Sequence, residues 1–244
     1  MNLLKGEKKM AEAYFSEELS PRQLSVVLHY MDILGATPED MHFLKTEEYI
    51  GDLFPVDLII FEPTQKSRYY TVATVGLSEY RFNNNFARSE LMMTLPLTWK
   101  PIFDKEEYYW APQLLRDIAY CVVGRKQGVN IGQVYLLENP NKEAKYTEFS
   151  DAIGGIITLP EMYPLTMFER EIGESFTRFF QVVPVSKPDV QKMDEVGPLQ
   201  FIQFDLHDSE NPLMVVKLKE KQVEGIDKLI QQNETSLKGT NDNN

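Results

Sequence analysis

The sequence predicts an α+β fold, a single domain in which helices flank a mostly antiparallel sheet. Short β-branched or apolar runs between turn-rich segments predict the strands, and two amphipathic patterns with helical spacing predict the main helices. The 244 residues are 43% hydrophobic and 25% charged, which is the composition of an ordinary globular protein. A chain of this length can bury a sizeable core, and no repeat or Pro/Gly/Ser-rich linker divides it.

The first predicted helix begins after Ser20. Ser20 and Gln23 have the spacing of a capping box, and Pro21 stands in the first turn, where proline is well tolerated. The apolar residues that recur at helical spacing are Leu24, Val27, Leu28, Met31 and Leu34. Gly35 follows as the expected stop, so this segment is predicted to be an amphipathic helix docked on the rest of the domain.

The next segment changes to strand-like runs. Residues 55–61, 69–75 and 87–95 are short and rich in β-branched or apolar residues, and turn-rich segments separate them. They predict three strands in one largely antiparallel sheet. A second helix is then predicted to begin at Pro112 and to end at Gly124.

The remaining elements are shorter. Further strands are predicted at 133–137, 153–159 and 177–183, and a short helix at 187–195 closes before Gly197. The pair Gly154 and Gly155 stands inside a strand-like run, which favours a bend or bulge.

The C-terminal residues allow more than one structure. Residues 198–206 fit either a helix or a strand, residues 214–232 have helical character, and the polar last dozen residues are expected to fray.

The charge is acidic. The chain carries 37 Asp and Glu residues against 25 Lys and Arg residues, a formal net charge of −12, and the acid excess is spread along both halves. A nucleic-acid binder needs a positive surface, so a DNA or RNA partner is not expected. The negative charge favours a basic partner, or it serves only solubility.

The cysteine count and the apolar runs indicate the compartment. Cys121 is the single cysteine, so the chain has no intrachain disulfide and no cysteine-based metal site, which fits a reducing environment. Residues 1–10 lack the apolar core of a signal peptide, and the longest apolar run, 118–123, is too short for a membrane span. We therefore expect a soluble, cytoplasmic protein with no membrane partner.

No catalytic or metal-binding pattern stands out. His29, His42 and His207 lie outside any motif and are expected to be surface or capping residues, and Cys121 lies in an apolar stretch where a thiol packs as a small hydrophobe. The sequence has no HExxH, no CxxC pair, no calcium loop and no Gly-rich phosphate loop. We predict no catalytic residues, no metal and no cofactor.

Three polar and aromatic strings remain, at residues 69–78, 87–99 and 109–119. The threonines of the first string, Thr71 and Thr74, suit a pleated strand, and Gly76 permits a positive φ at the end of it. Arg88 and Glu90 stand two apart, so on a strand they share one face. Each is expected to meet an opposite charge on a neighbouring strand.

These strings resemble the suppressor of fused (SUFU-like) family. The matching order is an acidic residue before a hydrophobic strand (57–60), then 69–78, 88–99, 110–119, and the string 180–185 with its following helix. The residues that carry the motifs are Thr71, Thr74, Gly76, Ser78, Arg88, Glu90, Leu91, Pro96, Trp99 and Trp110. The resemblance places a SUFU-like domain at 40–205, with an N-terminal extension at 1–39 and a C-terminal extension at 206–244.

The resemblance implies a domain that binds protein and does not catalyse. The animal member takes an extended peptide as an added β-strand in a cleft between two domains, and this chain is too short to contain the second one. Bacterial single-domain relatives look like immunity proteins that neutralise secreted toxins encoded beside them. The sequence also departs from the family at 132–134 and at 187–189.

Carrying the peptide cleft onto this chain places the partner-binding site at Cys121, Gln133, Val134 and Tyr135. The alternative is an ordinary edge strand without a partner.

Three hypotheses follow. The first is a cytosolic immunity protein (antitoxin) that blocks a toxin, such as a basic nuclease, encoded by a neighbouring gene. The second is a regulator or scaffold that binds an endogenous peptide by strand addition. The third is an unrecognised enzyme, whose site would use Ser78, Arg88, Glu90 or tyrosines in a pocket.

Overall fold

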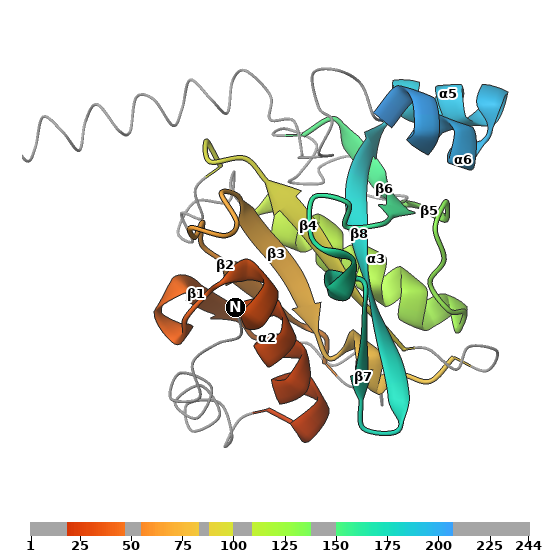
Figure 1. Ribbon diagram of the computed structural model, residues 1–244. Helices are drawn as coiled ribbons and strands as arrows, with labels where there is room; N and C mark the ends of the chain where they lie inside the picture. Colours follow the sequence, from red (N-terminus) through yellow and green to blue (C-terminus); the bar gives the residue numbers. More distant parts are fainter. Residues whose placement is uncertain (1–18, 47–54, 83–87, 100–108, 138–149, 207–244) are drawn as a thin grey trace, which may run out of the picture.

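The computed structural model of the chain describes residues 19–46, 55–82, 88–99, 109–137 and 150–206 (Figure 1). Its described strands form one eight-stranded sheet in the order β1-β2-β3-β4-β8-β6-β5, and β7 pairs with β8 beside this path. The strands are β1 (Met41–Leu44), β2 (Asp57–Phe61), β3 (Tyr70–Val75), β4 (Arg88–Leu95), β5 (Val134–Leu136), β6 (Ala152–Thr158), β7 (Glu169–Ile172) and β8 (Ser175–Ser186).

The pairing confirms the predicted mostly antiparallel sheet, because six of the seven pairs between described strands are antiparallel. The exception is the parallel pair of β4 with β8, in which Arg88 lies opposite Thr177 and Met92 lies opposite Gln181. β8 is long, so its first residues also pair with β7 and its last residues pair with β6. β8 therefore joins the two halves of the sheet.

Two strands were not predicted. β1 and β7 are only four residues long and partly exposed, and charged side chains fill most of β7. β7 lacks the apolar run that marks the other strands, and His42 interrupts the short apolar run of β1. Pairing with β2 and β8 holds the two strands in place.

Helix α2 (Pro21–Leu34) confirms the first helix prediction in both caps. The Ser20 hydroxyl accepts a hydrogen bond from the Gln23 amide at 3.1 Å, and the Gln23 side chain accepts one from the Ser20 amide at 2.9 Å. Gly35 ends the helix with φ 68°, a left-handed conformation that costs glycine little.

Helix α3 (Trp110–Arg125) corrects the second helix prediction. Gly124 lies inside the helix, and Lys126 is the C-cap with φ 52°. The Lys126 amide donates to the Val123 carbonyl at 3.1 Å, which closes the last turn. Glycine lowers helix stability without ending a helix by itself, and here the packing of the apolar face carries the helix past Gly124.

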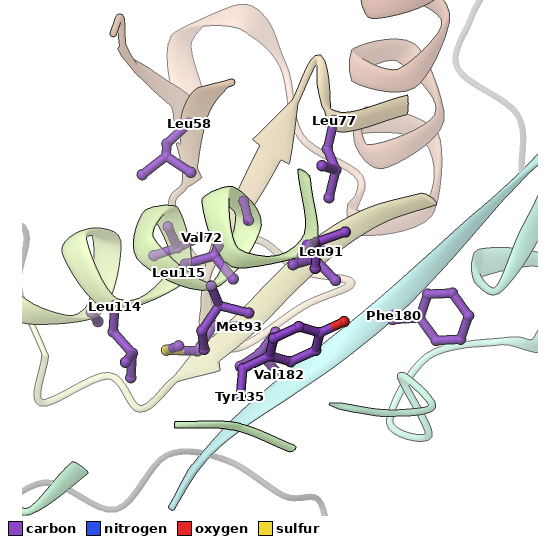
Figure 2. Packing of buried hydrophobic residues seen from close by; sticks show 14 of the residues in the cluster. Leu58, Val72, Leu77, Leu91, Met93, Leu114, Leu115, Tyr135, Phe180 and Val182 are labelled. Carbon is purple, nitrogen blue, oxygen red and sulfur yellow. The ribbon is translucent and has the colours of Figure 1, made fainter. Parts of the chain in front are cut away.

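The two helices cover opposite faces of the central strands (Figure 1). Successive side chains of a strand point to opposite faces, so Leu58 and Ile60 of β2 pack beneath α3 while Ile59 and Phe61 pack beneath α2. Figure 2 shows the α3 side, with sheet residues facing the helix. The labelled residues there are Leu58, Val72, Leu77, Leu91, Met93, Leu114, Leu115, Tyr135, Phe180 and Val182.

The C-terminal helices cover one end of the sheet. α5 (Lys187–Val196) begins and ends close to the predicted bounds, with Gly197 as its C-cap. The segment left open at 198–206 is helical, formed by α6 (Pro198–Gln200) and the π-helix η5 (Phe201–Leu206). These elements pack on β6 and β8 through Ile156, Val183, Val185, Met193, Phe201 and Ile202.

None of the helices in the described part of the chain has the length and apolar character that crossing a bilayer requires. The segment 214–232, the last dozen residues and His207 lie outside the described residues.

The register of β6 with β8 shifts between Ala152 and Gly154, directly before the glycine pair, which agrees with the predicted bend or bulge in this strand. A Cβ on Gly154 would stand 2.1 Å from the Tyr135 carbonyl oxygen of β5. A Cβ on Gly155 would stand 2.7 Å from Ile118 of α3. The pair therefore lets β5 and α3 approach β6 closely.

Replacing Gly154 by alanine is expected to destabilise the domain by about 2 kcal/mol or more, because the new methyl group meets rigid backbone of β5. Gly124→Ala is the matched control. It lies in a helix with no atom within 4 Å of the added Cβ, so it should stabilise by about 0.5–1 kcal/mol. Urea unfolding of both variants measures the two shifts, and equal signs would contradict this account.

Candidate functional site

The motif residues at the β3–β4 end of the sheet form a buried network around the Glu90 carboxylate. One carboxylate oxygen accepts from the backbone amides of Gly76 and Ser78 at 3.1 and 2.9 Å, and the other accepts from the Thr74 hydroxyl. Gly76 has φ 114°, as predicted for the turn after β3. The carboxylate therefore holds the turn that leads into the 3-10 helix η2 (Leu77–Glu79).

Arg88 binds the same turn from the other side. Its guanidinium donates to the carbonyls of Ser78 and Glu79 at 2.7 and 3.0 Å. The prediction that Arg88 and Glu90 each meet an opposite charge on a neighbouring strand is wrong. Their partners are backbone groups and a hydroxyl, because the turn brings unpaired peptide groups within reach of both side chains.

The other motif residues are structural as well. Leu91, Trp99 and Trp110 are buried in the cluster beneath α3, where the Trp99 ring meets Tyr70 edge-on at 5.4 Å. The Thr71 hydroxyl lies 3.0 Å from the Tyr163 hydroxyl. Pro96 directly follows β4, and its carbonyl accepts from the Trp99 amide at 2.9 Å. These contacts stabilise the fold around the motifs.

The N-terminus of α2 docks on this network. The Ser20 hydroxyl donates to the Glu79 carboxylate at 2.5 Å, so the helix cap is tied to the turn that Glu90 holds. Arg22 donates to the Ile172 carbonyl and to the hydroxyls of Ser175 and Thr177 at 2.9–3.1 Å. α2 therefore links the turn after β3 with the β7–β8 hairpin.

His29 corrects a second expectation. The residue is 2% exposed, and its ring lies 4.4 Å from the Phe179 ring at a tilt of 44°. The ring is also within hydrogen-bond distance of the Met167 carbonyl and the Arg170 guanidinium. Burial lowers its pKa to about 4. His29 is thus a neutral core residue, whereas His42 is partly exposed and pairs with Glu62 at 2.7 Å.

The predicted partner-binding residues lie together, at β5 and at the end of α3 beside it. Cys121 and the buried Tyr135 pack in the same cluster beneath α3. The Arg125 guanidinium stands 4.6 Å from the centre of the Tyr135 ring. Burial raises the pKa of both the Cys121 thiol and the Tyr135 hydroxyl. These side chains support β5 from within.

Gln133 closes the turn that enters β5. Its side-chain oxygen accepts from the Asn130 amide at 2.9 Å and from the Tyr135 hydroxyl at 3.1 Å, and its amide group donates to the Gly128 carbonyl at 3.2 Å. Its hydrogen-bonding groups are therefore used within the domain. A partner at β5 has to use backbone groups and the side chains on the other face of the strand.

The outer edge of β5 supplies such groups. The Gln133 carbonyl accepts from the Ile157 amide, and the Leu137 amide donates to the Ile153 carbonyl, both at 2.9 Å. Alternate residues of an antiparallel strand point the same way, so the backbone groups of Val134 and Leu136 point away from β6. No strand in the described part of the chain pairs with this edge.

Apolar side chains surround this edge. Ile131, Leu136 and Leu199 are 41%, 44% and 63% exposed, and we call them the β5-edge patch. Leu199 of α6 lies over Gly132, where an added Cβ would stand 2.8 Å from its side chain. Ile131, Leu136 and Leu199 were not among the predicted site residues. Side chains alternate along a strand, so the buried Tyr135 could have indicated that Leu136 is exposed. Leu199 reaches the edge of β5 only through the packing of α6.

No cluster of three or more histidine, cysteine or acidic side chains in the described residues could hold a metal ion. The candidate functional site is the outer edge of β5 with the β5-edge patch.

A model of the suppressor of fused protein (SUFU) family matches residues 53–219, a stretch that contains both the turn network and β5. The chain belongs to the suppressor of fused family. A search of the curated proteins by sequence found no match.

Solved suppressor of fused structures resemble this fold. A putative SUFU homologue from Neisseria gonorrhoeae FA 1090 has 14% identity and a TM-score of 0.52, over 75% of this chain and 89% of that one. Drosophila Suppressor of Fused has 13% identity and a TM-score of 0.45, over 81% of this chain and 46% of that one. A chain of the Sufu–Fu complex has 13% identity and a TM-score of 0.45, over 86% and 88%.

Glu90 gives this SUFU domain a testable pH dependence. Burial raises its pKa from 4.5 to about 7, against the hydrogen bonds that favour its charged form. The protonated carboxyl is thus favoured in the folded state, and this stabilisation is present below pH 4.5 and lost as the pH rises through about 7.

Glu90→Gln should therefore gain stability relative to the wild type as the pH rises from about 5 to 8, by roughly 3 kcal/mol in total. Urea unfolding of both proteins at each pH gives the difference. The comparison cancels the contribution of His29, whose lowered pKa acts with the opposite sign between about 4 and 6.5. Parallel pH profiles for the two proteins would refute the role of Glu90.

Proposed function

We propose that this chain is a non-catalytic protein-binding domain that captures an extended segment of a protein partner along the outer edge of β5. The observation that carries the proposal is the outward-facing backbone of Val134 and Leu136 beside the β5-edge patch. An added strand would pair with these backbone groups, and its alternate side chains would reach the apolar border.

Within this function, we propose the role of a cytoplasmic immunity protein that neutralises a toxin encoded by a neighbouring gene. The family resemblance supports it, and so does the net charge of −12, because an acidic inhibitor associates faster with a basic toxin such as a nuclease. Membership of the suppressor of fused family supports protein binding in general.

A regulator or scaffold that binds an endogenous peptide at the same edge is the second candidate. Both candidates would use the same strand edge, so the identity of the neighbouring gene is what distinguishes the immunity role from the regulatory role. An immunity gene lies beside a large secreted-protein gene.

The motif residues favour binding over catalysis. Ser78 and Glu90 are 0% exposed, and Arg88 is engaged with the backbone of the same turn. A substrate cannot reach the two buried groups without opening the core, so the turn network gives the enzyme hypothesis no support.

The strand-edge proposal predicts that Leu136→Asn weakens the complex with the toxin encoded by the neighbouring gene at least about tenfold, since it removes an apolar contact at the edge. Leu165→Asn is the matched control, because Leu165 is 89% exposed and lies on the 3-10 helix η4 (Leu165–Met167), remote in sequence from β5. It should change affinity less than about twofold. Isothermal titration calorimetry measures both, and equal losses, or no complex with the wild type, would reject the proposal.

The contribution of the net charge to binding can be tested separately. If the net charge serves binding, the association rate with the toxin should fall roughly tenfold or more as the ionic strength rises from low salt to about 0.5 M. Stopped-flow mixing measures this rate. A rate that stays flat would assign the charge to solubility alone.

A further inference from the structure

The two faces of β5 are bordered by different surfaces. Tyr135 points toward α3 and is buried in the cluster beneath that helix. Val134 packs on the opposite face, against the cluster that β6 and β8 form with the C-terminal helices. Alternate residues of a strand share a face, so Leu136 lies on the same face as Val134. A strand added at the outer edge of β5 would therefore present its side chains alternately to these two surfaces.

The surface on the Leu136 face is apolar and carries no charge. Leu136 is exposed there, and Leu199 of α6, which is exposed as well, lies over Gly132 at the start of the same segment. Neither residues 128–137 nor α6 includes a charged residue. Side chains that an added strand places on this face would meet the two leucines, so apolar residues fit there best.

The surface on the Tyr135 face carries positive charge. The Arg125 guanidinium lies 4.6 Å from the centre of the Tyr135 ring, and Arg125 is exposed. On the inner side of Tyr135 lies Gly155 of β6, and Ile118 of α3 fills the space above that glycine. The exposed guanidinium therefore lies toward the outer edge. Lys126, the exposed residue that ends α3, adds a second positive charge next to it.

We propose that the segment captured at β5 alternates apolar and acidic residues. Its apolar side chains lie over Leu136 and Leu199, and its acidic side chains point toward Arg125, which determines the specificity of the edge. This inference rests on the proposed function, since it names the chemistry of the strand that the edge accepts. Opposite charges on neighbouring strands of a sheet stabilise the pairing, and a guanidinium suits a carboxylate especially well.

The net charge of the protein makes this preference distinctive. A net charge of −12 repels acidic peptides and attracts basic ones over the whole surface. A preference for acidic side chains at β5 can therefore come only from the local charge at this edge. The rest of a partner can still be basic, because the net charge acts at long range and Arg125 acts on the captured segment.

A second copy of this chain fits the edge less well. Its own β5 segment, residues 128–137, has no acidic residue, so Arg125 would gain no partner from it. A wild-type dimer in solution whose interface includes the Val134 and Leu136 amides would assign the edge to a second copy and overturn the proposal. Light scattering and NMR of the full chain measure the two properties.

Short synthetic peptides test the preference directly. One peptide repeats Val-Glu, a second repeats Val-Lys, and a third has the composition of the first with its valines and glutamates in two blocks. The full-length protein is titrated with each peptide, and NMR follows the Val134 and Leu136 amides. The Val-Glu repeat should bind about fivefold or more tighter than the Val-Lys repeat. The block peptide should also bind more weakly, because it cannot match both faces.

Variants of Arg125 locate the source of the preference. Arg125→Gln should bring the affinities of the Val-Glu and Val-Lys repeats within about twofold of each other, and Arg125→Lys should keep most of the difference. Loss of the contact with Tyr135 alone would weaken all peptides equally, so the ratio of affinities separates the two effects. Arg68→Gln is the matched control, because it removes the same charge from an exposed residue before β3, and three strands separate β3 from β5. It should leave the ratio unchanged.

The outcomes distinguish this inference from the proposed function. Equal affinities of the Val-Glu and Val-Lys repeats, or a preference for Val-Lys, would overturn the inference and leave strand addition at β5 standing. An equally strong block peptide would do the same. If no peptide shifted the Val134 and Leu136 amides, strand addition itself would be rejected, and this inference with it.

Discussion

The parallel pairing of β4 with β8 joins the two halves of this protein. β1 to β4 form one half of the sheet, and β5, β6 and β7 attach through β8. Among the described strands no other pair connects the two halves. The position of the candidate binding edge thus depends on this one ladder, because β6 pairs with β8 and β5 pairs with β6. Both faces of the central strands are buried, by α2 on one side and α3 on the other, which fixes the register of the ladder against slippage.

The polar motif residues support this junction. Glu90 lies in β4 opposite Phe179 of β8 and holds the turn after β3, while Arg22 of α2 reaches the β7–β8 hairpin. A buried carboxylate is costly, and three donors offset part of that cost. The polar motif residues, which in the sequence resemble candidates for a catalytic site, therefore stabilise the fold. The proposed binding site lies at the far edge of the sheet, along β5.

The sequence predicted local structure well where the signal is local. The caps of α2 at Ser20 and Gly35, the irregularity of β6 beside Gly154 and the positive φ of Gly76 all depend on neighbouring residues, and each prediction is confirmed. The prediction for Gly124 is wrong because packing of the helix against the sheet outweighs its weak local preference. The predicted partners of Arg88 and Glu90 were also wrong, because the actual partners depend on where the turn after β3 lies in space.

The sequence by itself determined the α+β class, most of the elements and the family, because periodicity, caps and motif order are properties of the chain. It also located β5 as the candidate edge through the family resemblance. Only the tertiary structure decided that β4 and β8 run parallel, that His29 is a core residue, and that Leu199 of α6 borders β5. These contacts join residues far apart in the chain, and no local pattern encodes which distant surfaces bury one another.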